Sequence, residues 1–298
     1  MPPRLPLATP TPDFAERHKR RLAEIAAYSI PLFRRQAGSD TPVKLATGWI
    51  LRLASHWFLG TASHVFEELN FRGSPDSDLM LHVSAERIVP IGGNRSAATN
   101  EDVSVIELEP DVIQQGRGYW QPVSLFDFDD SDPTSIAGGV HFLFGYPLET
   151  MRFEPSSEHQ AGEFTGRPFQ ALGLWNQQLA EDAGRQSEHY EFDHRRHLLL
   201  PLDSEATDET GRRVATPLLN GVSGAPIWRL FLDAAGDVVP LLAGVETTVL
   251  GKPPRYIRGT RLSIVAAVID DLQPGLLAEL SRISVVQIGR PRHDGDAP

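Results

Sequence analysis

The chain has 298 residues, a formal net charge of −11, 41% hydrophobic residues and no cysteine. A chain of this length can bury a large apolar core, which excludes a disulfide-dependent miniprotein. Without cysteine there is no iron–sulfur cluster, thiolate zinc site or cysteine nucleophile, and any metal would need His and carboxylate ligands. We expect neither a metal nor a cofactor.

The acidic balance argues against a nucleic-acid partner, because binding to phosphates requires a basic face. No apolar run approaches the about 20 residues that span a bilayer, and the first thirty residues contain no stretch of the signal-peptide type. We therefore expect a cytoplasmic protein without a membrane span. The sequence leaves the oligomeric state open.

The N-terminal segment reads as a loose lead-in over 1–12 followed by an amphipathic helix over 12–28. Thr11 and Pro12 form a typical helix start, and apolar residues then recur at near-helical spacing. The basic middle of this helix suits a partner or a membrane surface, but a solvated face on a helix packed against the main domain explains it as well. We favour the packed helix.

Short strand-like pieces follow, separated by turn residues and rich in Val, Ile, Phe and Trp. In the first half they lie at 28–35, 43–53, 56–62, 79–83, 86–91, 103–108 and 139–145. In the second half they lie at 168–175, 189–193, 197–202, 226–233, 239–248 and 255–259. A final helix fits 263–273, with Ser263 as its cap.

This pattern predicts an all-β fold of two packed, six-stranded β-barrels with a helix near each end. A single large sandwich would give the same strand count. The predicted divisions are a lead-in and helix over 1–27, a first barrel over 28–147, a second barrel over 148–287 and a flexible tail over 288–298.

Three short segments carry candidate chemistry. His64 follows an apolar strand and small residues, Asp102 precedes an alternating strand, and Ser223 lies between glycines ahead of another strand. Each has a structural explanation when taken alone: an ordinary histidine of intermediate burial, a turn cap, and a turn whose glycines supply positive φ. Their combination and order carry the functional argument.

In the order His, Asp, Ser, these segments resemble the chymotrypsin-like (trypsin-like) serine peptidases. The matching text is Thr-Ala-Ser-His at 61–64, Asp-Val-Ser-Val-Ile at 102–106 and Gly-Val-Ser-Gly-Ala-Pro at 221–226. Gly-Tyr-Pro at 145–147 and Gly-Val-Glu-Thr at 244–247 extend the resemblance. It implies a cysteine-free member with His64 and Asp102 on the first barrel and Ser223 on the second.

The resemblance also implies the role of each group. His64 would accept the proton of the Ser223 hydroxyl as it attacks an acyl carbon, and would then donate it to the leaving amine. Asp102 would hold the tautomer of the histidine. The backbone N–H groups of Gly221 and Ser223 would form the oxyanion hole.

Departures from the family pattern are informative. Val222 stands where many members carry an Asp that pairs with a freshly cut N-terminus, so activation by N-terminal trimming is not expected. Pro217 occupies the place of a specificity Asp, so a preference for Lys or Arg is not predicted from that position. We include Pro217, Glu246 and Thr247 as candidate substrate-binding residues, with Glu246 able to supply a carboxylate of its own.

Two segments of the second half need an explanation. The stretch 188–197 is rich in His and acidic residues, but a strand would spread them over both faces, so we favour a solvated strand and loop over a metal site. The stretch 204–211 reads as a mobile loop near the site.

The sequence therefore predicts a serine endopeptidase that cuts a protein or peptide substrate. A catalytically silent protein of the same fold, used as a peptide-binding or scaffold module, is the main alternative. An α/β-hydrolase is a weaker one, since Ala225 replaces the second glycine of its nucleophile motif and alternating β–α units are missing. A structural β-sandwich with an accidental triad is also open.

Overall fold

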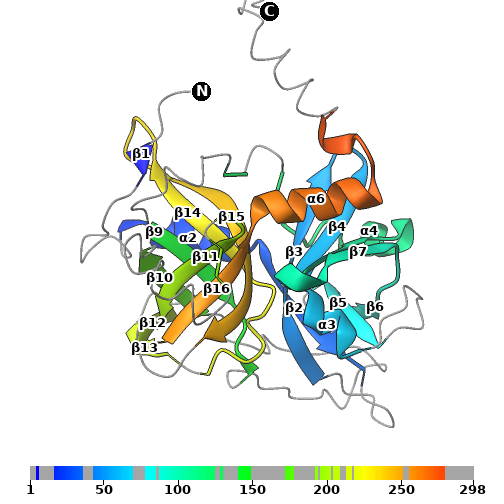
Figure 1. Cartoon of the computed structure of the whole chain (residues 1–298), viewed down its shortest axis with the longest axis horizontal. Coiled ribbons are helices and arrows are strands. Elements are labelled where there is room, and N and C mark those ends of the chain that lie inside the picture. The colour runs from blue at the N-terminus through cyan, green and yellow to red at the C-terminus, as the bar shows by residue number, and fades with distance from the viewer. Residues whose placement is uncertain are drawn as a thin grey trace, which may run out of the picture.

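The computed structural model (Figure 1) describes residues 5–6, 17–35, 43–69, 78–84, 87–124, 128–129, 140–148, 172–177, 192–193, 195–202, 204–208, 213–216, 218–250 and 255–278. Its strands form two sheets that lie side by side, one built from the first half of the chain and one mostly from the second half. The predicted all-β fold is confirmed.

Over the residues that the structure describes, the first sheet has seven strands in the order β6-β5-β2-β3-β4-β8-β7, all paired antiparallel. Its strands are β2 (Ser29–Arg34), β3 (Val43–Leu53), β4 (His56–Ala62), β5 (Leu79–Ser84), β6 (Arg87–Pro90), β7 (Arg95–Ala98) and β8 (Val103–Glu107).

The described part of the second sheet has nine strands, eight of them in the order β11-β16-β15-β14-β9-β10-β12-β13, with β1 added on β14. Its strands are β1 (Leu5–Pro6), β9 (Val140–Gly145), β10 (Leu172–Gln177), β11 (His197–Leu202), β12 (Glu205–Asp208), β13 (Arg213–Ala215), β14 (Pro226–Leu232), β15 (Val238–Leu250) and β16 (Arg255–Arg261). Within the described residues the two sheets have seven and nine strands, compared with the six-stranded type expected for each barrel.

Side-chain alternation along β3 and β4 explains how the two sheets pack. Ile50 and Leu59 belong to an apolar cluster made within the first sheet. Trp49 and Phe58, which point the other way, belong to a cluster shared with Trp228 and other residues of the second sheet. A third cluster lies within the second sheet. Each sheet therefore has its own core, and a common core joins them.

Short helices pack against the two sheets. They are α2 (Lys19–Ala26), α3 (Ser63–Glu67), the 3₁₀ turn η1 (Thr99–Glu101), α4 (Pro110–Gly116) and α6 (Leu262–Leu272). Helix α6 follows the last strand of the second sheet but lies across the first (Figure 1), where Gln273 just beyond it donates a 2.8 Å hydrogen bond to Glu107 of β8. Among the described residues, no helix is long and apolar enough to cross a membrane.

The helix predicted over 12–28 is described from residue 17 onward and forms at Lys19–Ala26, with Ile25 fully buried in the common core. Residues 5–6, expected in a loose lead-in, instead pair with β14. Helix α6 begins one residue earlier than predicted, with Arg261 rather than Ser263 at its N-cap. The flexible tail predicted from residue 288 lies outside the described residues.

In the second half, one further prediction is corrected and another is only partly described. The stretch predicted as a mobile loop at 204–211 contains β12, which pairs with both β10 and β13. Of the strand predicted at 189–193, only Phe192 and Asp193 are described, and neither belongs to a strand.

Candidate active site

A cavity of about 610 Å³ is lined by side chains from both halves of the chain. The first half contributes His64 and Asp102, which flank the paired strands β4 and β8. The second half contributes Leu218, Leu219, Asn220, Ser223, Glu246, Thr247, Thr248, Val249, Arg255 and Arg258. Five segments of the sequence, around His64, Asp102, 218–223, 246–249 and 255–258, thus meet at one place.

The Asp102 carboxylate bonds both the imidazole ring and the backbone N–H of His64. Its Oδ2 and Oδ1 lie 2.8 Å and 3.1 Å from His64 Nδ1, and Oδ1 also accepts a 2.9 Å hydrogen bond from the His64 backbone N–H. The Asp102 carbonyl accepts the N–H of Ser63 at 3.1 Å. Asp102 therefore satisfies the first free N–H groups of the short helix α3 and orients the imidazole with the same carboxylate.

This arrangement selects one tautomer of His64. An ionised carboxylate only accepts hydrogen bonds, so the ring proton belongs on Nδ1 and Nε2 keeps a free lone pair. The hydrogen bond to Asp102 raises the pKa of His64 above its ordinary value, against the opposing effect of partial burial. Nε2 can thus act as a proton acceptor.

Asp102 adopts a backbone conformation that is unusual outside glycine. It closes η1 with φ 52° and ψ 43°, in the left-handed region, and its N–H bonds to the Thr99 carbonyl at 3.1 Å. Asp is one of the residues that tolerates this region, and strained positions of this kind cluster at functional sites. The turn brings the carboxylate back over the end of β4.

Ser223 lies in a tight loop ahead of β14. Gly221 and Gly224 on either side have φ of 84° and 90°, and two turn hydrogen bonds of 2.9 Å run from Val222 N to Leu219 O and from Ala225 N to Val222 O. Glycine supplies these φ values without steric cost. The loop therefore presents the serine at a sharp turn, while Val222 is buried in the apolar cluster of the second sheet.

Thr47 of β3 joins the serine loop to the first sheet. Its N–H donates a 3.0 Å hydrogen bond to the Ser223 carbonyl, and its Oγ1 donates one of 2.9 Å to the Gly221 carbonyl. The same Oγ1 accepts the N–H of Tyr146 at 3.1 Å. One buried threonine thus connects β3, the serine loop and the end of β9.

Gly224 is the point of closest approach between the serine loop and the first sheet. A Cβ at this position would overlap Thr61 Oγ1 and the Thr47 carbonyl, and would approach Ala62 N to 2.9 Å. Since these atoms sit at the strand end that leads into His64, the absence of a side chain at Gly224 allows the serine and histidine segments to meet.

The peptide between Asn220 and Gly221 has a fixed orientation. The Asn220 carbonyl accepts the N–H of Leu148 at 2.7 Å. In a trans peptide the C=O and the following N–H point in opposite directions. The Gly221 N–H is therefore directed away from Leu148.

Glu246 and Thr247 lie on β15, bordering the cavity. The Glu246 backbone N–H and C=O bond to Ala225 and Gly224 at 2.8 Å each. Its side chain is buried, and Oε2 has no hydrogen-bond partner among the residues that the structure describes. Burial raises the pKa of Glu246 to about 8. Thr247 Oγ1 donates a 3.2 Å hydrogen bond to the Arg258 carbonyl.

Glu101 is a buried residue that the sequence interpretation missed. Its carboxylate bonds Arg196 Nη2 and His197 Nε2, each at 2.7 Å, and its carbonyl accepts a hydrogen bond from Thr260 Oγ1. All three partners belong to the second half of the chain. Glu101 therefore ties the second sheet to the residue directly before Asp102.

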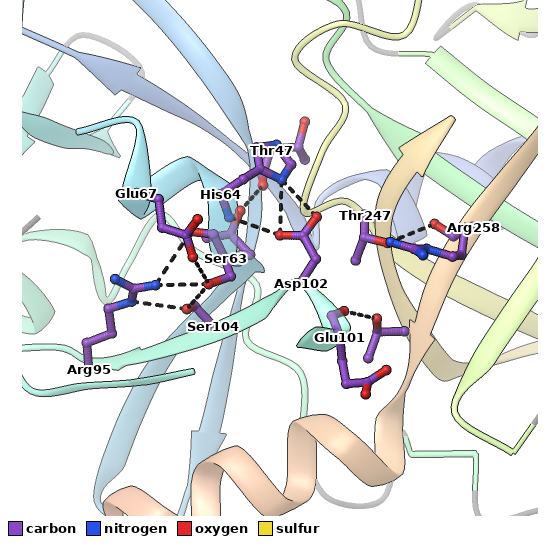
Figure 2. A network of polar contacts seen from close by, with 12 residues as sticks. Thr47, Ser63, His64, Glu67, Arg95, Glu101, Asp102, Ser104, Thr247 and Arg258 are labelled. Atoms are coloured by element: carbon purple, nitrogen blue, oxygen red, sulfur yellow. Dashed lines mark hydrogen bonds and ion pairs between the residues drawn. The ribbon is translucent and has the colours of Figure 1, made fainter. Parts of the chain in front are cut away.

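A second polar network contacts helix α3 at Ser63, the residue directly before His64 (Figure 2). Arg95 donates 3.0 Å hydrogen bonds to Ser63 Oγ and Ser104 Oγ, and its guanidinium lies 4.6 Å from the centroid of the Phe66 ring. Ser63 Oγ in turn donates a 3.2 Å hydrogen bond to Glu67. The network fixes the start of α3, where His64 sits.

Of the predicted site residues, the structure brings His64, Asp102, Ser223, Glu246 and Thr247 to one cavity. Gly221 lies two residues before Ser223 in the same loop, and Pro217 is outside the described residues. Although His64 and Ser223 both line the cavity, no hydrogen bond joins their side chains in this part of the structure.

The described part of the predicted solvated stretch 188–197 is not solvated throughout. His197 is buried and paired with Glu101, and its Nδ1 accepts the Asp193 N–H at 3.1 Å, as expected for a neutral imidazole. Burial lowers the pKa of His197. Within the residues that the structure describes, no group of three or more His, Cys, Asp or Glu is placed to hold a metal ion.

The sequence matches no protein-family model and none of the curated proteins. In structure, the chain is similar to a thermostable serine protease, AL20, from an extremophilic microorganism, with 12% sequence identity and a TM-score of 0.41. The similarity covers 80% of this chain and 92% of that protein.

Proposed function

We propose that this chain is a serine endopeptidase of the chymotrypsin-like type, with Ser223 as nucleophile, His64 as general base and acid, and Asp102 as the residue that orients the histidine. The observation that carries the proposal is the cavity shared by all three residues, in which the Asp102 carboxylate bonds both the ring and the backbone of His64.

The proposed reaction begins with attack of Ser223 Oγ on the carbonyl carbon of a peptide bond. His64 Nε2 accepts the hydroxyl proton as the new C–O bond forms, and the resulting imidazolium is stabilised by Asp102. The proton then passes to the leaving amine as the C–N bond breaks. A water molecule, deprotonated by the same Nε2, releases the acyl group and restores Ser223.

The negative charge that develops on the carbonyl oxygen needs donors fixed in advance. We assign this role to the N–H groups of Gly221 and Ser223. The hydrogen bond from Leu148 to the Asn220 carbonyl supports the assignment, because it sets the direction of the Gly221 N–H before substrate binds. Removing one such donor typically costs about 10²–10³ in rate.

The environment of Val222 supports an enzyme that needs no N-terminal cleavage. Its side chain is 1% exposed and packs in an apolar cluster with Leu143 and Ala225. Valine carries no charge to pair with a new N-terminus, and burying an unpaired charge in this apolar cluster would be costly. We therefore propose that activity does not depend on N-terminal cleavage. We further propose that the protein acts in the cytoplasm on a protein or peptide substrate.

A second candidate function is a catalytically silent peptide-binding module. The observation that favours it is the absence of a hydrogen bond between the Ser223 and His64 side chains in the described structure. Such contacts are often long in a substrate-free site and shorten when substrate binds, so the distinction rests on activity.

The test is hydrolysis of a fluorescently labelled unfolded protein by the full chain, with and without a serine-directed covalent inhibitor. We expect inhibitor-sensitive cleavage by the wild type and by Ser204→Ala, a control on an exposed serine, and none by Ser223→Ala. Binding of the labelled substrate without cleavage would support the silent module instead.

A further inference from the structure

The cavity that contains His64 and Ser223 also contains two arginine side chains, Arg255 and Arg258 of β16. Within the described part of the chain, neither arginine forms an ion pair. Both are only partly exposed. An unpaired guanidinium lining a cavity is a ready site for an anion, because its N–H groups suit a carboxylate in a two-point hydrogen bond.

The backbone of Arg258 is fixed within the sheet that borders the cavity. It pairs with Leu199 of β11 and Thr248 of β15, and its carbonyl accepts the Thr247 hydroxyl. Figure 2 shows Arg258 and Thr247 on the side of Asp102 away from Arg95. The Nε of Arg258 is buried and has no hydrogen-bond partner among the described residues. A buried donor of this kind gains when a ligand supplies an acceptor.

The acidic residues that line the cavity do not neutralise the positive charge of Arg255 and Arg258. The Asp102 carboxylate is engaged by His64. Glu246 interacts electrostatically with His64, Asp102 and Arg258, and burial raises its pKa to about 8, so that near pH 7 its carboxyl is mostly protonated and uncharged. At neutral pH the cavity therefore presents, to the same space as Ser223, two guanidinium groups that have no ion-pair partner among the described residues.

We propose that this cavity binds the side chain of the substrate residue on the acyl side of the cleaved bond, and that Arg258, assisted by Arg255, selects glutamate or aspartate there. The inference rests on the proposed peptidase function and names its substrate class. A Lys or Arg side chain would meet like charge in the same space, and a neutral side chain would leave Arg258 unpartnered.

The experiment compares kcat/KM for peptides that differ only in the acyl-side residue, namely Glu, Asp, Gln, Asn, Leu and Lys, at pH 7. We expect the better acidic peptide to exceed its amide counterpart by at least about tenfold, the effect of a charge-assisted hydrogen bond. Arg258→Gln should bring this ratio close to one, and Arg258→Glu should shift the preference towards Lys. The matched control Arg87→Gln, on an exposed arginine of β6, should keep the wild-type ratio.

Labelling of Ser223 by a small fluorophosphonate, measured on every variant, separates the two claims because it does not depend on the acyl-side residue. A wild type that labels but cuts Glu and Gln peptides at equal rates would overturn the acidic preference alone. A wild type that neither labels nor cuts any peptide would overturn both claims. Since the comparison of peptides on the wild type needs no variant, it remains decisive if an Arg258 variant fails to fold.

Discussion

The N–H of Thr47, in the middle of β3, bonds the carbonyl of Ser223 at 3.0 Å, so a strand of the first sheet directly holds the loop of the candidate nucleophile. The Thr47 hydroxyl adds a second bond to Gly221, two residues earlier in the loop. The position of Ser223 relative to His64 is thus set by backbone and side-chain bonds across the two halves of the chain.

Replacing this threonine tests the relationship. Thr47→Val keeps the shape of the side chain but removes the hydroxyl, which leaves the Gly221 carbonyl and the Tyr146 N–H without their partner. We expect a loss of about 1–3 kcal/mol in the free energy of unfolding, measured by urea denaturation. We also expect a lower kcat, because the loop is less firmly placed.

Thr47→Ser is the matched variant, since it restores the hydroxyl. It should recover most of both losses. Equal behaviour of the Val and Ser variants would show that the hydroxyl does not position the loop.

The pH dependence follows from the contact between His64 and Asp102. Because the hydrogen bond to Asp102 raises the pKa of His64, the midpoint of the acidic limb of the kcat/KM profile should lie above the ordinary histidine pKa of about 6.5. Activity should increase as pH rises through this pKa, since only the neutral imidazole accepts the serine proton. An NMR titration of His64 gives the same pKa without substrate.

Asp102→Asn provides the control for that titration. Loss of the carboxylate removes the main cause of the shift, so the His64 pKa should fall. An unchanged pKa in this variant would show that Asp102 does not set the charge state of the histidine.

Glu246 gives a prediction about stability. Its carboxyl has a folded-state pKa of about 8 because of burial, above its ordinary value of 4.5. Because its folded-state pKa is raised, the Glu246 carboxyl contributes its full stabilisation below pH 4.5. This contribution is lost as pH rises through about 8. The slope is up to about 1.4 kcal/mol per pH unit in that window.

Glu246→Gln removes this titration. The difference in unfolding free energy between the variant and the wild type should therefore grow in favour of the variant from pH 5 to pH 8, as measured by denaturation at a series of pH values. A difference that is constant with pH would mean that the Glu246 carboxyl ionises normally in the folded state.

The buried carboxylate of Glu101 links both halves of the chain next to Asp102. Glu101→Gln weakens the bonds to Arg196 and His197, and we expect it to lower the unfolding free energy by about 1–3 kcal/mol. Glu109→Gln, in the first half but outside this contact, should change it by less than about 0.5 kcal/mol. Similar values for the two variants would contradict a bridging role for Glu101.

Local sequence patterns predicted much of this structure. Apolar alternation located β3, β4, β8 and β14 to within about a residue or two, because their spacing and turn residues are local signals. The same patterns did not predict the short helix α3 or the strand β7. Helix α3 has five residues, and its first N–H groups are satisfied by Asp102, which is distant in the sequence.

In the candidate site, too, local patterns missed the residues whose role depends on distant parts of the chain. The segments were recognisable from local patterns, namely small residues before His64, an alternating strand after Asp102 and glycines around Ser223, and from their order along the chain. Thr47, Glu101 and Arg258 were not, since each is one ordinary residue in a strand or turn whose partners come from elsewhere in the chain. The functional roles assigned to the predicted residues, and the division into two barrels at residue 147, stay predictions.

The central claim is tested most directly by identifying the residue that carries the adduct after fluorophosphonate treatment of the full chain, by peptide mass spectrometry. We predict a single adduct on Ser223, no adduct in Ser223→Ala, and labelling of His64→Ala slowed at least about a thousandfold. Thermal unfolding should show both variants folded. An adduct on another residue, or labelling of folded His64→Ala at the wild-type rate, would contradict the account.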